Sequence, residues 1–153
     1  NGEVMHLDEM KLMHKLIDIF KYKEEYQMET SGLHPQDMYV LERIYFKEKV
    51  RVMDIAKTYH IPPSTLTGIM DRIYAKKYIE RIRSQEDRRV VEIVVTDEGK
   101  KIVEQHIRED RCFVKNFFNT LEPEKRGEFR RLLAELVSNV DKETLFMEKG
   151  DGI

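Results

Sequence analysis

The chain has 153 residues, of which 37% are charged and 41% hydrophobic, with 7 glycines and 4 prolines. This length predicts one domain with its own core, and this composition argues against disordered and collagen-like chains. The formal net charge is only −2, but residues 50–101 hold 11 Lys and Arg against 8 Asp and Glu, which favours one basic region facing phosphate.

The first expected element is a long helix over residues 5–28, ended by Thr30-Ser31-Gly32. Its apolar positions have the spacing of one helix face, and they are Met13, Leu16, Ile17 and Phe20. Pro35 stands where the first turn of a second helix is expected. The buried side of that helix is predicted to carry Met38, Leu41 and Ile44.

A helix-turn-helix is expected next, after a short strand or linker at residues 50–52. Its first helix starts at Asp54, and the pair Pro62-Pro63 stops that helix and starts the second one. The second helix opens with three hydroxyl side chains, of which Ser64 is expected to cap the helix. Three hydroxyls exceed what one cap requires, so the group is expected to reach phosphates or base edges. These side chains are Ser64, Thr65 and Thr67.

Residues 84–99, SQEDRRVVEIVVTDEG, combine a basic turn, an apolar strand and a helix start. Asp87, Arg88 and Arg89 form the turn, residues 90–95 the strand, and Thr96 begins the helix. A short helix fits the major groove of DNA, and an arginine-tipped hairpin fits the minor groove. The pattern therefore indicates a protein that reads duplex DNA.

Two further amphipathic helices are expected after the hairpin, separated by a break at residues 121–123. The first covers residues 98–119, and the second has an apolar face that includes Leu132, Leu136 and Val140. Together with the first helix of the chain, they carry more apolar surface than a small basic lobe requires. They either pack as an intramolecular bundle or form a two-fold dimer.

The helix-turn-helix and hairpin resemble the multiple-antibiotic-resistance regulator (MarR) family of winged helix-turn-helix repressors. The wing of that family runs Asp-x-Arg, a short strand and Thr-x-x-Gly, and the resemblance is most specific from Leu33 to Gly99. It implies a mainly α single domain, residues 1–153, with a small β-wing. A winged helix-turn-helix lobe is expected at 34–99 and dimerisation helices at 5–33 and 100–148. The residues expected in the homodimer interface are Met13, Leu16, Ile17, Phe117, Phe118, Leu132, Leu136 and Val140.

The resemblance also assigns roles at the DNA. In the family's wing the acid holds the second arginine, which enters the minor groove, so these roles fall to Asp87 and Arg89. Arg72 would anchor a phosphate. Gly68 and Lys77 depart from the family, which often has a long side chain at the first position and glycine at the second. The residues expected at the DNA are Ser64, Thr65, Thr67, Gly68, Arg72, Arg83, Asp87, Arg88 and Arg89, with Arg81 as a further phosphate contact.

Other classes of function find less support in the sequence. Cys112 and His106 stand on different helix faces and no glycine-rich phosphate loop occurs, so the chain is predicted not to be an enzyme and to need no cofactor. His106 and Asp110 share the i, i+4 spacing, but zinc takes three or four ligands, so no metal site is expected. The single cysteine fits a reducing cytoplasm and is expected to be buried rather than redox-active.

The sequence therefore predicts a cytoplasmic transcriptional regulator, a repressor that binds a pseudo-palindromic operator as a homodimer. The expected partners are double-stranded DNA, a second copy and a small anionic lipophilic or aromatic effector, with no membrane. Tyr39 and Arg43 are the candidate effector contacts. Two alternatives remain open: a winged-helix module that binds protein without specific DNA binding, and a redox- or metal-sensing regulator.

Overall fold

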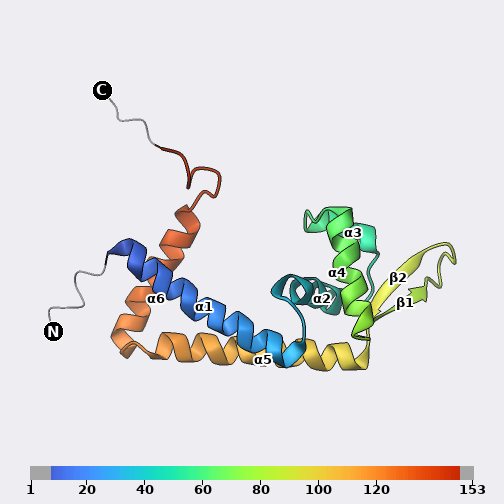
Figure 1. The fold of residues 1–153 in the computed structure, drawn as a ribbon, viewed down its shortest axis with the longest axis horizontal. Coiled ribbons are helices and arrows are strands. Elements are labelled where there is room, and N and C mark those ends of the chain that lie inside the picture. Colours follow the sequence, from blue (N-terminus) through green and yellow to red (C-terminus); the bar gives the residue numbers. More distant parts are fainter. Residues whose placement is uncertain (1–7, 149–153) are drawn as a thin grey trace. The chain divides into compact units, whose positions relative to one another are not determined.

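The structure is a computed structural model that describes residues 8–148, which form six helices and one antiparallel hairpin (Figure 1). The expected order of elements and the mainly α fold with a small β-wing are confirmed. The first helix is expected from residue 5, but residues 5–7 lie outside the described part. The elements are α1 (Glu9–Ser31), α2 (Pro35–Lys47), α3 (Val52–Thr58), α4 (Pro63–Ala75), β1 (Ile79–Arg83), β2 (Val91–Val95), α5 (Asp97–Asn119) and α6 (Pro123–Asn139).

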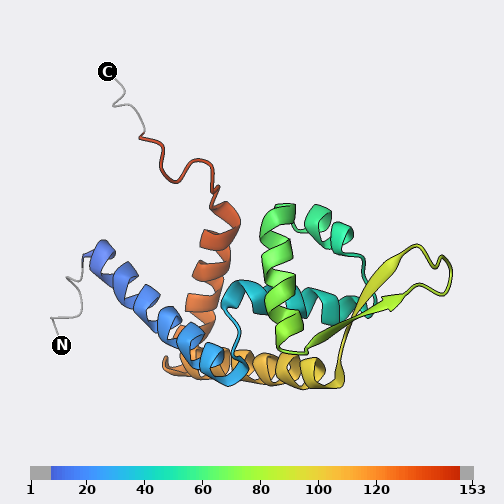
Figure 2. The same cartoon turned by 45° about the vertical axis from the view of Figure 1, so that its right-hand side comes forward.

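The chain divides into two compact units, the first ending at Arg111 and the second beginning at Cys112. In the first unit, α2 packs against α4 and β2, and the hairpin extends away from the helices in both views (Figures 1 and 2). Its core is made of fully buried aliphatic side chains, because each element turns one apolar stripe inward. These include Val40, Leu41, Ile44, Ile55, Leu66, Ile69, Ile73, Ile93 and Val103.

Local sequence signals explain where the helices begin and end. Gly32 adopts a φ of 69° after α1, and its amide donates to the carbonyl of Met28 at 2.7 Å. Pro35 and Pro63 occupy the first turns of α2 and α4, where a missing N–H costs nothing. Lys77 has a φ of 60° just after α4, a left-handed conformation that glycine adopts more readily than lysine.

The hairpin is closed onto α5 by Thr96 and Gly99. The Thr96 hydroxyl donates to the carbonyl of Lys77 at 2.7 Å and accepts from the amide of Gly99 at 3.1 Å. A Cβ on Gly99 would overlap the carbonyl oxygen of Tyr78, so only glycine fits beside that backbone. The Thr-x-x-Gly pattern is thus a backbone joint that fixes the wing to the start of α5.

Aromatic rings gather where α5 ends and α6 begins, in the second unit. Phe113 stacks on Phe117 with ring centroids 5.8 Å apart, and Phe118 lies 5.6 Å from Phe129. Cys112 is exposed, so the expectation that it is buried is wrong. In the described part of the chain, no helix combines the length and the apolar character needed to cross a membrane.

Candidate nucleic-acid interface

The helix α4 divides into a buried apolar face and an exposed polar face. Leu66, Ile69 and Ile73 are fully buried, whereas Ser64, Thr65, Thr67, Asp71 and Arg72 are exposed. The apolar face packs on α2 and α3. The polar face of α4 is therefore accessible, and a helix of this kind fits the major groove of DNA.

The N-terminus of α4 differs from the expectation at Ser64. Pro62, not Ser64, is the N-cap residue, and no side chain caps the helix. Ser64 instead lies inside the first turn, because Pro63 already has the backbone angles of a first helical residue. The Thr67 hydroxyl donates to the carbonyl of Pro63 at 2.9 Å. The first amides of α4 thus have no side-chain cap, which is the arrangement that binds phosphate at helix N-termini.

Gly68 does not owe its identity to packing within the protein. It is partly buried, and a Cβ there would lie 3.4 Å from the Arg72 guanidinium, an ordinary contact. Its role at the DNA therefore stays a prediction.

Arg72 has a partner that sequence spacing did not reveal. Its Nε and Nη2 donate to the two carboxylate oxygens of Asp37 on α2, both at 2.8 Å. The Asp37 side chain is only 2% exposed, whereas that of Arg72 is 52% exposed. The hydrogen bonds to Asp37 raise the pKa of Arg72, so its guanidinium stays protonated. Arg72 thus fixes α4 to α2. The guanidinium that binds Asp37 is the same group that is predicted to contact a phosphate.

The turn of the wing is ordered by its own side chains. The buried Ser84 hydroxyl accepts from the amides of Glu86 and Asp87 at 3.3 and 3.4 Å. Asp87 accepts from the backbone amide of Arg89 at 3.0 Å. Asp87 thus holds Arg89 through its backbone amide, as in an Asx-turn, and the entry of the Arg89 side chain into the minor groove stays a prediction.

The four wing arginines fall into two groups. Arg83 donates to the carbonyl of Arg88 at 3.2 Å, and Arg81 donates to the Tyr74 hydroxyl at 3.0 Å and lies over its ring. Arg88 and Arg89 are exposed at the tip of the hairpin. The tip thus presents two guanidinium groups, while Arg83 bonds the backbone of the tip and Arg81 joins the hairpin to α4.

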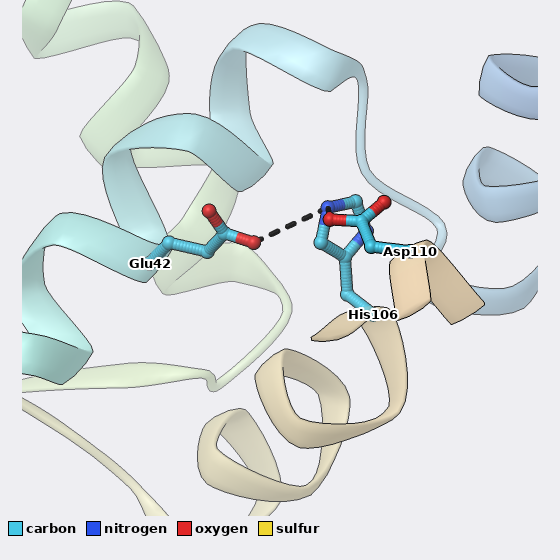
Figure 3. A group of neighbouring side chains, drawn as sticks. All are labelled: Glu42, His106 and Asp110. Atoms are coloured by element: carbon cyan, nitrogen blue, oxygen red, sulfur yellow. Dashed lines mark ion pairs between the residues drawn. The ribbon is translucent and has the colours of Figure 1, made fainter. Parts of the chain in front are cut away.

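Three side chains of types that can bind a metal ion, Glu42 on α2 and His106 and Asp110 on α5, lie close together (Figure 3). His106 Nε2 lies 3.2 Å from Glu42 Oε1 and 3.5 Å from Asp110 Oδ2. Burial raises the pKa of Glu42 despite the attraction of His106. Burial would also raise the pKa of Asp110, but hydrogen bonds from Lys23 and Gln27 hold it below its usual value. Sequence reasoning found the pair on α5 and missed Glu42, because no spacing links residues so far apart in the chain.

The candidate effector residues lie on the same helix as Glu42. The Arg43 guanidinium stands 4.3 Å above the Tyr39 ring, and its Nη1 lies 3.8 Å from Glu42. Tyr39 lines a cavity of about 180 Å³ bounded by α1, α2 and α5. This cavity is smaller than usual drug-sized sites, which start at about 300 Å³. An effector role for the pair stays a prediction.

The residues expected in a dimer interface leave much apolar surface exposed. Within α1, Met13 and Ile17 are 54% and 43% exposed, and within α6, Leu136 is 60% exposed. Leu132 and Val140 are exposed as well, while Leu16, Phe117 and Phe118 are partly buried. Apolar stripes of this length on single helices are typical of surfaces that a partner covers.

Comparison with known proteins gives one consistent result. Residues 19–106 match the family described as transcriptional regulator SarA/Rot. The chain is 27% identical over 126 residues to the HTH-type transcriptional repressor MdtR of Bacillus subtilis, covering 82% of this chain and 81% of that protein. The crystal structure of YusO from Bacillus subtilis superposes with a TM-score of 0.76 at 25% identity, covering 86% of this chain and 93% of YusO. Streptococcus pneumoniae FabT, in complex with DNA, superposes at 0.68 and 23% identity, covering 86% and 96%.

Proposed function

The chain belongs to the SarA/Rot transcriptional regulators, DNA-binding proteins with the winged helix-turn-helix of the MarR family, and from this premise we propose that it is a repressor. It binds a pseudo-palindromic operator as a homodimer and blocks transcription there. The relative MdtR carries the name of repressor, and a repressor of chromosomal genes acts in the cytoplasm.

One observation carries the proposal: a polar helix face and an arginine-tipped hairpin stand on one compact core. The face of α4 with Ser64, Thr65 and Thr67 enters the major groove, where hydroxyls bond base edges and phosphates. The uncapped amides of α4 add a phosphate contact. Arg88 contacts the phosphate backbone, and Arg89 enters the minor groove, whose narrow A·T-rich stretches attract arginine. FabT, which has the same fold, was crystallised in complex with DNA, and this supports DNA as the ligand.

A dimer supplies the specificity that one short helix lacks. Two copies of α4 have to stand about 34 Å apart to read successive major-groove faces. The helices α1, α5 and α6 supply the two-fold interface, to which α1 and α6 each contribute exposed apolar side chains.

An effector acts by changing the distance between the two α4 helices. The pair Tyr39 and Arg43 on α2 would receive a small anionic aromatic or lipophilic molecule, with the ring as stacking surface and the guanidinium as counter-ion. A related MepR-like protein, 28% identical, has been crystallised with pseudoligands, which supports a ligand at this fold.

Selection of bound sequences from random duplex DNA tests the proposal. We expect an A·T-flanked inverted repeat whose half-site centres lie about 10 base pairs apart or a multiple of this. Affinity for it should fall steeply with salt, since several phosphate contacts release counterions.

The other candidate, a winged-helix module that binds protein, predicts a different outcome. It would enrich no sequence, and its binding to any duplex would be weak. That result would overturn the repressor proposal.

A further inference from the structure

We propose that Glu42, His106 and Asp110 form a binding site for one divalent transition-metal ion of the zinc type (Figure 3). The ion would be held by one imidazole nitrogen and two carboxylate oxygens, with water completing the coordination. The inference is independent of which DNA sequence the protein reads.

The distances fit a tetrahedral ion without rearrangement of the backbone. Ligand atoms about 2.0–2.2 Å from zinc lie about 3.4 Å from one another. The distances from His106 Nε2 to the Glu42 and Asp110 oxygens are 3.2 and 3.5 Å. All three ligand atoms lie within 4.8 Å of one another. To bind an ion, the carboxylate oxygens of Glu42 and Asp110 therefore need to move only slightly closer together.

Each carboxylate keeps one oxygen for the ion and gives the other to the protein. Asp110 Oδ1 accepts from Lys23 Nζ at 2.7 Å and from Gln27 Nε2 at 2.9 Å, while Oδ2 faces His106. Glu42 Oε2 lies 3.8 Å from Arg43, while Oε1 faces His106. The hydrogen bond from Gln27 orients the Asp110 carboxylate, as outer partners orient ligand carboxylates at metal sites, whereas Arg43 is too far from Glu42 for a hydrogen bond.

The chemistry of the ligands selects the class of ion. One imidazole suits zinc, iron or nickel better than calcium, and two carboxylates make the site less soft than a cysteine site. The side chains of Glu42 and His106 are 16% and 18% exposed, so the ion would replace few waters on that side. The ammonium of Lys23 opposes a cation, so affinity should be modest, on the order of micromolar.

The charge of Lys23 provides a test that a nonspecific surface site would fail. Zinc titrations by calorimetry and by competition with a chromophoric chelator should give one ion per chain, with the C112S background removing the thiol. His106→Ala and Glu42→Gln should each lower the affinity at least tenfold. Lys23→Met should raise it several-fold, because a repelling charge 2.7 Å from a ligand carboxylate is removed. His34→Ala is the matched control, since His34 is exposed and lies outside the cluster.

Cobalt(II) in place of zinc reports the ligand set directly. We expect visible absorption bands typical of cobalt(II) with nitrogen and oxygen ligands, and we expect these bands to vanish in His106→Ala. Circular dichroism should show that His106→Ala and Glu42→Gln are both folded. Equal zinc affinity in wild type, His106→Ala and Glu42→Gln would overturn the proposal. Wild-type zinc binding no tighter than that of exposed surface side chains outside the cluster would overturn it as well. Operator binding is measured separately on the same samples, so a failed metal site leaves the repressor proposal intact.

Discussion

At the scale of single residues, Arg72 joins two elements of the DNA-binding lobe. Asp37 is buried and would be an uncompensated charge without the guanidinium. We expect Arg72→Ala to lower the midpoint of thermal unfolding by several degrees, and Asp37→Asn in the same chain to recover part of the loss. Arg88→Ala is the control, because Arg88 is an exposed arginine at the hairpin tip.

Salt dependence separates the two roles of Arg72. If it also contacts a phosphate, the slope of log affinity against log salt should fall by about one per half-site in Arg72→Ala. An unchanged slope together with lower stability would assign Arg72 a structural role alone.

The wing makes a second residue-scale prediction, centred on Arg89. Arg89→Ala should weaken operator binding by about tenfold per half-site, with the largest loss on A·T-rich flanks. Asp87→Ala should lose part of that affinity, because the carboxylate that orders the amide of Arg89 is gone. The double variant should cost little more than Arg89→Ala alone. If the losses of affinity in the two single variants simply add in the double variant, or if flank composition does not change the loss in Arg89→Ala, the minor-groove role is contradicted.

At the scale of elements, the joint between hairpin and α5 depends on Gly99. Gly99→Ala should lower the free energy of unfolding by about 2 kcal/mol or more, because the new methyl group collides with the carbonyl of Tyr78. Gly127→Ala in α6 is the matched control. A Cβ there meets nothing within 4 Å, and alanine in a helix interior gains about 1 kcal/mol over glycine. Denaturant unfolding of both variants measures the difference, and equal effects would show that the close approach is relieved by backbone movement.

At the scale of the whole molecule, the exposed apolar stripes of α1 and α6 call for a partner. Sedimentation at micromolar concentration should give a species of twice 18.4 kDa. Ile17→Glu and Leu136→Glu should shift it toward the monomer, because each buries a charge in the interface. Phe46→Glu should not, since Phe46 is an exposed apolar residue on α2, outside the terminal helices. A wild-type protein that sediments only as a monomer would contradict both the proposed homodimer and the proposed pseudo-palindromic operator.

The order of elements was decided by the sequence because its signals are local. Pro35, Pro63 and Gly32 mark helix ends through their own backbone angles, and Thr96 and Gly99 mark the wing joint through bonds to adjacent backbone. The helix ends depend on residues close in the chain, whereas Thr96 and Gly99 also meet the backbone of Lys77 and Tyr78 at the other end of the hairpin. Periodicity and turn chemistry therefore recovered the winged helix-turn-helix.

The tertiary structure alone decided which distant side chains meet. Asp37 reaches Arg72, and Glu42 reaches His106, across separations that no periodicity encodes. It also decided that Cys112 is exposed, since the burial of a helical side chain depends on how neighbouring helices are placed. Spacing in a sequence reports one helix face or one strand face, whereas a contact between two helices depends on how their cores pack.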